Sequence, residues 1–166
     1  MDKFEDVLLS KQKSNMIPDE YNFFGRLVGG WDFDWIWNKD KGRKNLKGEW
    51  VFSWVIEGTA IQDVFICPSR STRADEPQAD AEYGTTTRVY VPDKKAWDIA
   101  YACEGELTIL EAKKEGEKIV LTNTKNKNSK WVFSEIEDDS FHWQNITVCN
   151  DGTWYVNADL YATRKK

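Results

Sequence analysis

A few charged side chains on strand-like stretches are the residues of this chain that could do chemistry. Asp63, or its neighbour Gln62, lies in an apolar run, and Arg88 alternates with Tyr90. Glu135 continues an alternating aromatic run, so it is also a candidate for an inner face. Because a buried charge needs a partner, Arg88 is expected either to pair with Glu135 or to bind a ligand carboxylate. Asp63 or Glu135 could instead act as a general base in apolar surroundings.

Other patterns of catalytic or metal-binding residues are missing from the sequence. The single histidine, His142, alternates with two aromatic residues, which predicts an outward position and excludes the usual His-rich metal sites. The cysteines Cys67, Cys103 and Cys149 are widely spaced, which is typical of reduced, buried thiols rather than of a disulfide framework. We therefore expect no catalytic residue, no metal and no cofactor, and a binding protein rather than an enzyme.

Large aromatic side chains recur at alternate positions of several stretches. The segment GGWDFDWIW (29–37) contains four of them, and the period of two residues is that of a strand with one aromatic face. The sets expected to face inward are Trp31, Phe33, Trp35 and Trp37; Trp50, Phe52, Trp54 and Ile56; Trp97, Ile99 and Tyr101; Trp131, Phe133 and Glu135; and Phe141, Trp143 and Asn145. These rings either fill the interior completely or line a chamber.

If the rings line a chamber, the aromatic and charged residues above form its wall. The candidate ligand-binding residues are Trp35, Trp37, Trp54, Asp63, Arg88, Tyr90, Trp97, Trp131, Glu135 and Trp143.

The elements that would position these residues are mostly strands. Two short helices are expected first, over 2–14 and 18–29. About ten strands are expected to follow, over 30–38, 48–57, 59–67, 83–91, 95–103, 106–114, 117–124, 129–137, 139–149 and 153–163. Most connectors are short turns, which indicates an antiparallel meander, and closing a meander of this size removes its exposed edges. The predicted fold is all-β: a roughly ten-stranded up-and-down barrel with short N-terminal helices.

Two connections are longer than hairpin turns. Residues 38–48 form a basic loop, and residues 68–84 form a polar segment without hydrophobic periodicity. We expect the second at an open end of the barrel, either as a surface loop or as a flap over the cavity mouth. The chain is expected to be a single domain, 1–166, whose N-terminal helical segment, 1–29, closes the barrel base.

The net charge and the apolar content of the chain limit the classes of partner it can bind. A formal charge of −5 and a pI near 5.0 argue against nucleic-acid binding, which needs clustered lysine and arginine. The start of the chain lacks the pattern of a secretory signal, and no apolar run is long enough to cross a bilayer. We therefore expect a cytoplasmic location and no membrane partner, while a homodimer stays an open alternative.

Segments at both ends of the chain resemble the calycin superfamily, which includes lipocalins, fatty-acid-binding proteins and nitrobindin-like barrels. The segments are RLVGGW (26–31), with its Gly-x-Trp, and DLYATRKK (159–166). The resemblance implies that Trp31 closes the barrel base and that Arg164 packs over it. GTTTRVY (84–90), WVFSEI (131–136) with SFHW (140–143), and the final ATR are similar to a bacterial family of calycin-like domains of unknown function, from about residue 20 to the end.

The nitrobindin-like members raise the question of haem. In them a histidine near the end of the last strand binds the iron, whereas this chain has Asp159 and Tyr161 in that neighbourhood. The comparison therefore implies no haem site here.

The function expected from the sequence is binding of a small hydrophobic or aromatic molecule, with an acidic group on that molecule as an option. Two alternatives stay open: a barrel enzyme, such as an isomerase or hydrolase using Asp63 or Glu135, and a filled barrel that acts as an interaction module. A deep, partly polar cavity would favour the first two, and a solid interior would favour the third.

Overall fold

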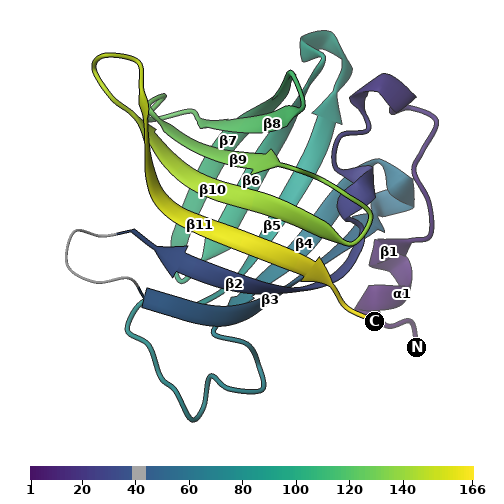
Figure 1. Cartoon of the computed structure of the whole chain (residues 1–166). Helices are drawn as coiled ribbons and strands as arrows, with labels where there is room; N and C mark the ends of the chain where they lie inside the picture. The colour runs from purple at the N-terminus through teal and green to yellow at the C-terminus, as the bar shows by residue number, and fades with distance from the viewer. Residues whose placement is uncertain (39–43) are drawn as a thin grey trace.

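The computed structural model describes residues 1–38 and 44–166, and the fold is a closed antiparallel barrel, as predicted (Figure 1). Within these residues the strands form one 11-stranded sheet in the order β1-β3-β2-β11-β10-β9-β8-β7-β6-β5-β4. The sheet closes because β3 also pairs with β4. The last strand, β11, pairs with the first barrel strand, β2, so the two ends of the chain form one seam.

The ten barrel strands lie over the ten predicted segments. Their bounds are β2 Gly29–Trp37, β3 Lys44–Val55, β4 Ala60–Cys67, β5 Glu82–Val91, β6 Ala96–Cys103, β7 Glu106–Glu115, β8 Lys118–Asn123, β9 Ser129–Ser134, β10 Ser140–Val148 and β11 Trp154–Arg164. Burial alternates along most of them, as on the inward positions Thr86, Arg88 and Tyr90 of β5. The alternation of large rings in the sequence therefore does correspond to one buried face per strand.

The N-terminal segment is less helical than predicted. Only α1 (Phe4–Leu8) is an α-helix; it leads directly into the short strand β1 (Leu9–Ser10), which pairs with β3. The second predicted helix consists of two 3-10 turns, η1 (Asp19–Tyr21) and η2 (Gly25–Leu27). Further 3-10 turns are η3 (Ile56–Gly58) and η4 (Pro92–Lys94). Such short segments cannot sustain an isolated α-helix, and α1 leaves the apolar Phe4 exposed instead of burying it.

Side chains from the N-terminal segment fill one end of the barrel, the base. Ile17, Phe24 and Leu27 are fully buried, and the ring of Phe24 meets Trp97 edge-on at a centroid distance of 5.3 Å. The indole N–H of Trp97 donates a hydrogen bond of 2.8 Å to the carbonyl of Tyr21. The interior is therefore packed at the base.

Trp31 and Arg164 meet at the base, on paired positions of β2 and β11. Trp31 is fully buried, and its indole N–H donates to the Leu27 carbonyl at 2.8 Å. The guanidinium carbon of Arg164 lies 4.1 Å from the centroid of the Trp31 ring. The same guanidinium donates to the carbonyl oxygens of Val28 (2.9 Å), Arg26 (2.9 Å) and Asp138 (2.7 Å). Arg164 thus joins the end of the chain to the N-terminal segment.

The long polar connection lies at the other end of the barrel from α1, the open end, and runs from Pro68 to Ala81, because residues 82–84 already belong to β5 (Figure 1). It is anchored on Glu49 of β3: the Arg70 side chain donates to this carboxylate through Nη2 at 2.7 Å, and the Arg70 backbone N–H donates at 2.9 Å. Of the predicted basic loop 38–48, residues 39–43 lie outside the described part, and residues 44–48 belong to β3.

Two predictions about individual residues need correction. Ile56 is not an inward residue: it has φ +44°, follows the end of β3 and is 48% exposed. The three cysteines form no disulfide, but only Cys67 is buried, and Cys149 is exposed because it lies in the turn after β10. No helix in the described residues is long and apolar enough to cross a membrane.

Candidate ligand-binding site

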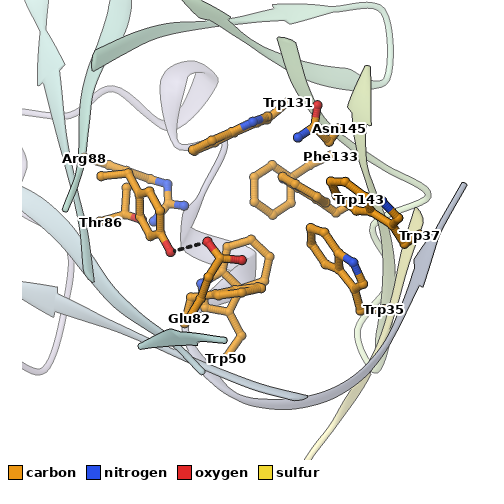
Figure 2. Close-up of a pocket in the computed structure, with 12 residues that line it drawn as sticks. Trp35, Trp37, Trp50, Glu82, Thr86, Arg88, Trp131, Phe133, Trp143 and Asn145 are labelled. Atoms are coloured by element: carbon orange, nitrogen blue, oxygen red, sulfur yellow. Dashed lines mark hydrogen bonds between the residues drawn. The ribbon is translucent and has the colours of Figure 1, made fainter. Parts of the chain in front are cut away.

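The open half of the barrel contains a cavity of about 210 Å³. Figure 2 shows the lining side chains converging on it from strands all around the barrel. The lining consists of the aromatic residues Trp35, Trp37, Trp50, Phe65, Tyr101, Trp131, Phe133 and Trp143, and the polar residues Glu82, Thr86, Arg88 and Asn145. The rings therefore fill the base but leave a chamber above it.

The wall of the cavity is a connected run of aromatic rings. Trp35 and Trp37 are stacked at a centroid distance of 5.9 Å, and Trp35 contacts Trp143 at 5.5 Å. Trp143 contacts Trp131 at 5.9 Å, and Trp131 meets Tyr101 edge-on at 5.6 Å. Because these rings support one another, they hold a preformed surface for a flat apolar molecule.

Arg88 and Asp63 form a buried ion pair between the cavity and the packed base. Each residue is 1% exposed, and the Arg88 Nη1 donates to Asp63 Oδ2. The other carboxylate oxygen of Asp63 accepts the backbone N–H of Thr86 at 3.2 Å. The Arg88 guanidinium also lies 5.1 Å from the ring centroid of Phe24 and 5.2 Å from that of Phe52. Asp63 thus balances the charge of Arg88.

The predicted pairing of Arg88 with Glu135 is wrong. Strand β9 ends at Ser134, and Glu135 follows with φ +50°, which breaks the inward alternation. The Glu135 side chain is 78% exposed and faces His142 on the outer wall, with 3.8 Å between Oε2 and Nδ1. Glu135 therefore belongs neither to the cavity nor to the ion pair.

Glu82 and Tyr101 form the polar group at the cavity mouth. The Tyr101 hydroxyl donates a hydrogen bond of 2.9 Å to Glu82 Oε1, drawn as the dashed line in Figure 2. Burial raises the pKa of Glu82, the nearby carboxylates of Asp80 and Glu104 raise it further, and the Tyr101 hydrogen bond opposes this rise. Burial, followed by the charge of Glu82, also raises the pKa of Tyr101. The hydroxyl is therefore a firm donor, and the carboxyl group is its acceptor.

A glycine makes room for this pair. A Cβ atom on Gly84 would lie 2.6 Å from the Tyr101 hydroxyl oxygen, so any larger residue would push the ring away. Gly84 occupies the inward position between Glu82 and Thr86 on β5. The glycine of GTTTRVY thus serves the mouth of the cavity.

The cavity floor contains buried donors without partners. Among the described residues, neither the Trp50 indole N–H nor the Arg88 Nε–H has a hydrogen-bond acceptor. An unsatisfied buried donor costs about 1–3 kcal/mol. Packing at the floor is therefore not optimised for stability alone, which is common at functional sites.

Of the candidate residues, the cavity brings together Trp35, Trp37, Arg88, Trp131 and Trp143. The others predicted on inner faces lie elsewhere in the interior. Asp63 lies behind Arg88, while Trp54, Tyr90 and Trp97 belong to the packed core, with Tyr90 stacked on Tyr21 at 5.4 Å. These positions face inward as the periodicity indicated, but they lie deeper than the cavity.

Sequence reasoning missed Glu82, Thr86 and Phe65 as inner-face residues. It placed four further lining residues on inner faces without naming them as ligand-binding: Trp50, Tyr101, Phe133 and Asn145. The predicted strand begins at residue 83, one residue later than β5, so Glu82 falls in the predicted polar connection. It has the same parity as Arg88 and Tyr90, so extending the strand by a single residue would have placed it on the inner face.

His142 lies on the outer wall, as its alternation predicted. Its ring is stacked on Tyr161 of β11 at a centroid distance of 4.5 Å, and its Nε2 is 2.7 Å from Asp159 Oδ1. Asp159 and Tyr161 occupy the region in which nitrobindin-like proteins have their haem-binding histidine, and both contact His142 on the outer wall. Within the described residues, no group of three His, Cys, Asp or Glu side chains is arranged to hold a metal ion.

Comparison with known proteins supports the fold. No protein-family model matches the chain, and no curated protein sequence matches it. The structure of Rv2717c from M. tuberculosis is similar with a TM-score of 0.58 and 11% identity, covering 90% of this chain and 99% of that one. The S-type phycobiliprotein lyase CpeS from Guillardia theta is similar with a TM-score of 0.58 and 12% identity, covering 99% of each chain. At these identities the likeness shows a shared barrel fold, consistent with the calycin-like resemblance.

Proposed function

We propose that the protein binds a small, flat aromatic molecule inside the open half of its barrel. The observation that carries this proposal is the tryptophan-lined cavity of about 210 Å³. A barrel filled for stability alone would leave no such chamber, so the cavity favours ligand binding over a filled interaction module.

The volume limits the size of the ligand. An apolar cavity of roughly 150 Å³ takes up benzene, and drug-sized ligands occupy roughly 300–1,000 Å³. A cavity of about 210 Å³ therefore suits one ring or two fused rings, with room for a substituent toward the mouth. Each aromatic contact contributes about 0.5–1.5 kcal/mol beyond its buried area.

The polar groups argue against a barrel enzyme that uses Asp63 or Glu135, and also against an acidic ligand. Asp63 is engaged by Arg88, and Glu135 is exposed outside the lumen, so neither candidate base stands free in the cavity. The same ion pair weakens the case for an acidic ligand, because Arg88 is already neutralised. The similar phycobiliprotein lyase carries an enzyme name, but its likeness supports the barrel and not a reaction.

Titration of the protein with 2-naphthylmethanol, a neutral two-ring probe, by isothermal calorimetry tests the proposal. We expect saturable binding at one site, weakened about 3- to 10-fold in Trp131→Leu because one ring contact is lost. The matched control is Trp154→Leu, since Trp154 is a partly exposed tryptophan that does not line the cavity. Absence of binding, or equal loss in both variants, would overturn the proposal.

A further inference from the structure

We propose that the cavity selects organic cations, and that the positive group of an aromatic compound with an alkylammonium substituent binds at Glu82. This inference rests on the proposed function and adds the chemical class of the ligand. It follows from the charges around the cavity, from the faces of its rings and from the surface outside its mouth.

The charges in the cavity leave one carboxyl group uncompensated. Arg88 is the cation of the lining, and Asp63 neutralises it directly behind the cavity wall. Among the residues that the structure describes, no lysine or arginine side chain forms an ion pair with Glu82. Figure 2 shows the Glu82 carboxyl group directed into the cavity. A cationic ligand group placed there would provide the missing partner.

The rings favour a positive charge as well. The face of an aromatic ring carries negative potential, and tryptophan attracts a cation more strongly than tyrosine or phenylalanine does. The wall contains Trp131 and Trp143, and Trp131 contacts Tyr101 edge-on beside Glu82. A desolvated ammonium group between such rings and a carboxylate is held by both, whereas an anion would be repelled by both.

The surface outside the mouth continues the negative field. A second hollow shares Glu82 and Tyr101 with the cavity and is also lined by Glu104 and Glu106. Carboxylates around an entrance raise the local concentration of cations and lower that of anions. The carboxylates at the entrance thus favour positively charged ligands, as Glu82 and the aromatic rings of the cavity do.

Tyr101 prepares Glu82 for this role. Its hydroxyl donates to Oε1, which fixes the carboxyl group and leaves Oε2 without a hydrogen bond inside the described structure. A primary ammonium group has three N–H donors, so it can bind this second oxygen while the attached ring lies against the aromatic wall.

Three probes with the same ring system but different charges test whether ligand charge affects affinity. They are the cation 2-naphthylmethylammonium, the neutral 2-naphthylmethanol and the anion 2-naphthoate. By calorimetry near neutral pH, we expect the cation to bind at least about 10-fold more tightly than the alcohol, and the alcohol more tightly than the acid. Equal affinities, or tightest binding of the acid, would overturn the cation inference and leave the proposed function standing. Failure of all three to bind would overturn the proposed function itself.

An isosteric variant tests the position of the cation. We expect Glu82→Gln to lower the affinity for the cation about 10-fold or more while changing that for the alcohol by less than about 3-fold. Glu106→Gln is the control, because Glu106 lines the outer hollow but not the tryptophan cavity. Equal losses in the two variants would mean that the general field, and not Glu82, selects the ligand, which would contradict the assigned position.

The pH dependence of cation affinity tests the role of Glu82 a second time, without any substitution in the protein. Tyr101 donates to the Glu82 carboxyl group, and Arg73 donates to the Glu82 backbone carbonyl at 3.3 Å. The other titratable or charged groups that line the same hollows as Glu82 are Arg88, Asp80, Cys103, Glu104 and Glu106. Because burial raises the pKa of Glu82, the carboxylate gains its proton at a higher pH than an exposed glutamate does. We expect the affinity for the cation to fall as the pH decreases and Glu82 gains its proton. The affinity for the alcohol should not change. Parallel curves for both probes would contradict a carboxylate contact.

Discussion

The buried charges of Asp63 and Arg88 lie where the packed base meets the cavity, and each satisfies the other. Removing water from two charges is expensive, so such a pair contributes little by itself. Removing only one partner lowers the stability of the fold, because the remaining charge stays buried without a partner near rings such as Phe24 and Phe52. The pair therefore acts as a unit and not as two independent residues.

We expect Arg88→Met to lower the free energy of unfolding by about 3–5 kcal/mol, because it leaves the Asp63 carboxylate buried and unpaired. Adding Asp63→Asn should restore part of this loss, since the amide oxygen can still accept the Thr86 N–H without carrying a charge. Urea midpoints of the two single variants and the double variant measure the coupling. Simple additivity of the two losses would show that the residues do not depend on each other.

At the scale of the strands, alternation of aromatic and small or polar residues was enough to predict which face turns inward. The prediction failed where a strand had already ended: Ile56 and Glu135 both follow the last strand residue with positive φ, and each turns its side chain outward. A period of two residues contains no information on where the strand stops. The partner of Arg88 was missed for a related reason, because it depends on the register between β4 and β5, in which Asp63 lies opposite Thr86.

Depth along the barrel axis also could not be read from the sequence. Trp97 and Trp143 show the same alternation, yet Trp97 is packed under Phe24 while Trp143 lines the cavity. The difference depends on how far the N-terminal segment reaches into the base. Its 3-10 turns have weak sequence signals, so the boundary between solid core and chamber appears only in the folded structure.

The closure of the seam between β2 and β11 can be tested at Arg164. Arg164→Met should lower the free energy of unfolding by about 2–4 kcal/mol, because it removes hydrogen bonds to three carbonyl oxygens and the contact with Trp31. The control, Arg26→Met, changes an arginine that is more than half exposed and should cost less than about 0.5 kcal/mol. Equal thermal or urea midpoints for the two variants would show that Arg164 is not needed for closure.

On the scale of the whole molecule, one outward carboxylate connects three distant parts of the chain. Glu49 of β3 accepts hydrogen bonds from Arg70 of the long connection and from Lys165 just after β11, the latter at 2.8 Å. The Arg70 guanidinium lowers the pKa of Glu49 to about 2, with a further contribution from Lys165, although burial opposes the shift. The long connection is thus tied to the barrel wall by charge.

The ion pairs of Glu49 make the free energy of unfolding depend on pH. Because the pKa of Glu49 is lower in the folded state, its contribution is present above the ordinary value of 4.5 and is lost as pH falls toward about 2. We expect Glu49→Gln to be less stable than the unaltered protein by about 1–2 kcal/mol at neutral pH, after solvent screening at the half-exposed Arg70. Denaturant curves at several pH values should show this difference vanishing in acid. A difference that persists unchanged at low pH would contradict the charge assignment.

The seam between β2 and β11 also sets an order of events during synthesis. A ribosome delivers β2 at the start and β11 at the end, so the sheet stays open, with unpaired edges on β2 and β10, until the last strand emerges. An open edge of this kind can pair with another chain, and charged side chains along it discourage such pairing. Asp32 and Asp34 alternate with the rings of β2 on its outer face. We expect Asp32→Asn and Asp34→Asn to increase aggregation during translation more than they lower the free energy of unfolding of the finished barrel.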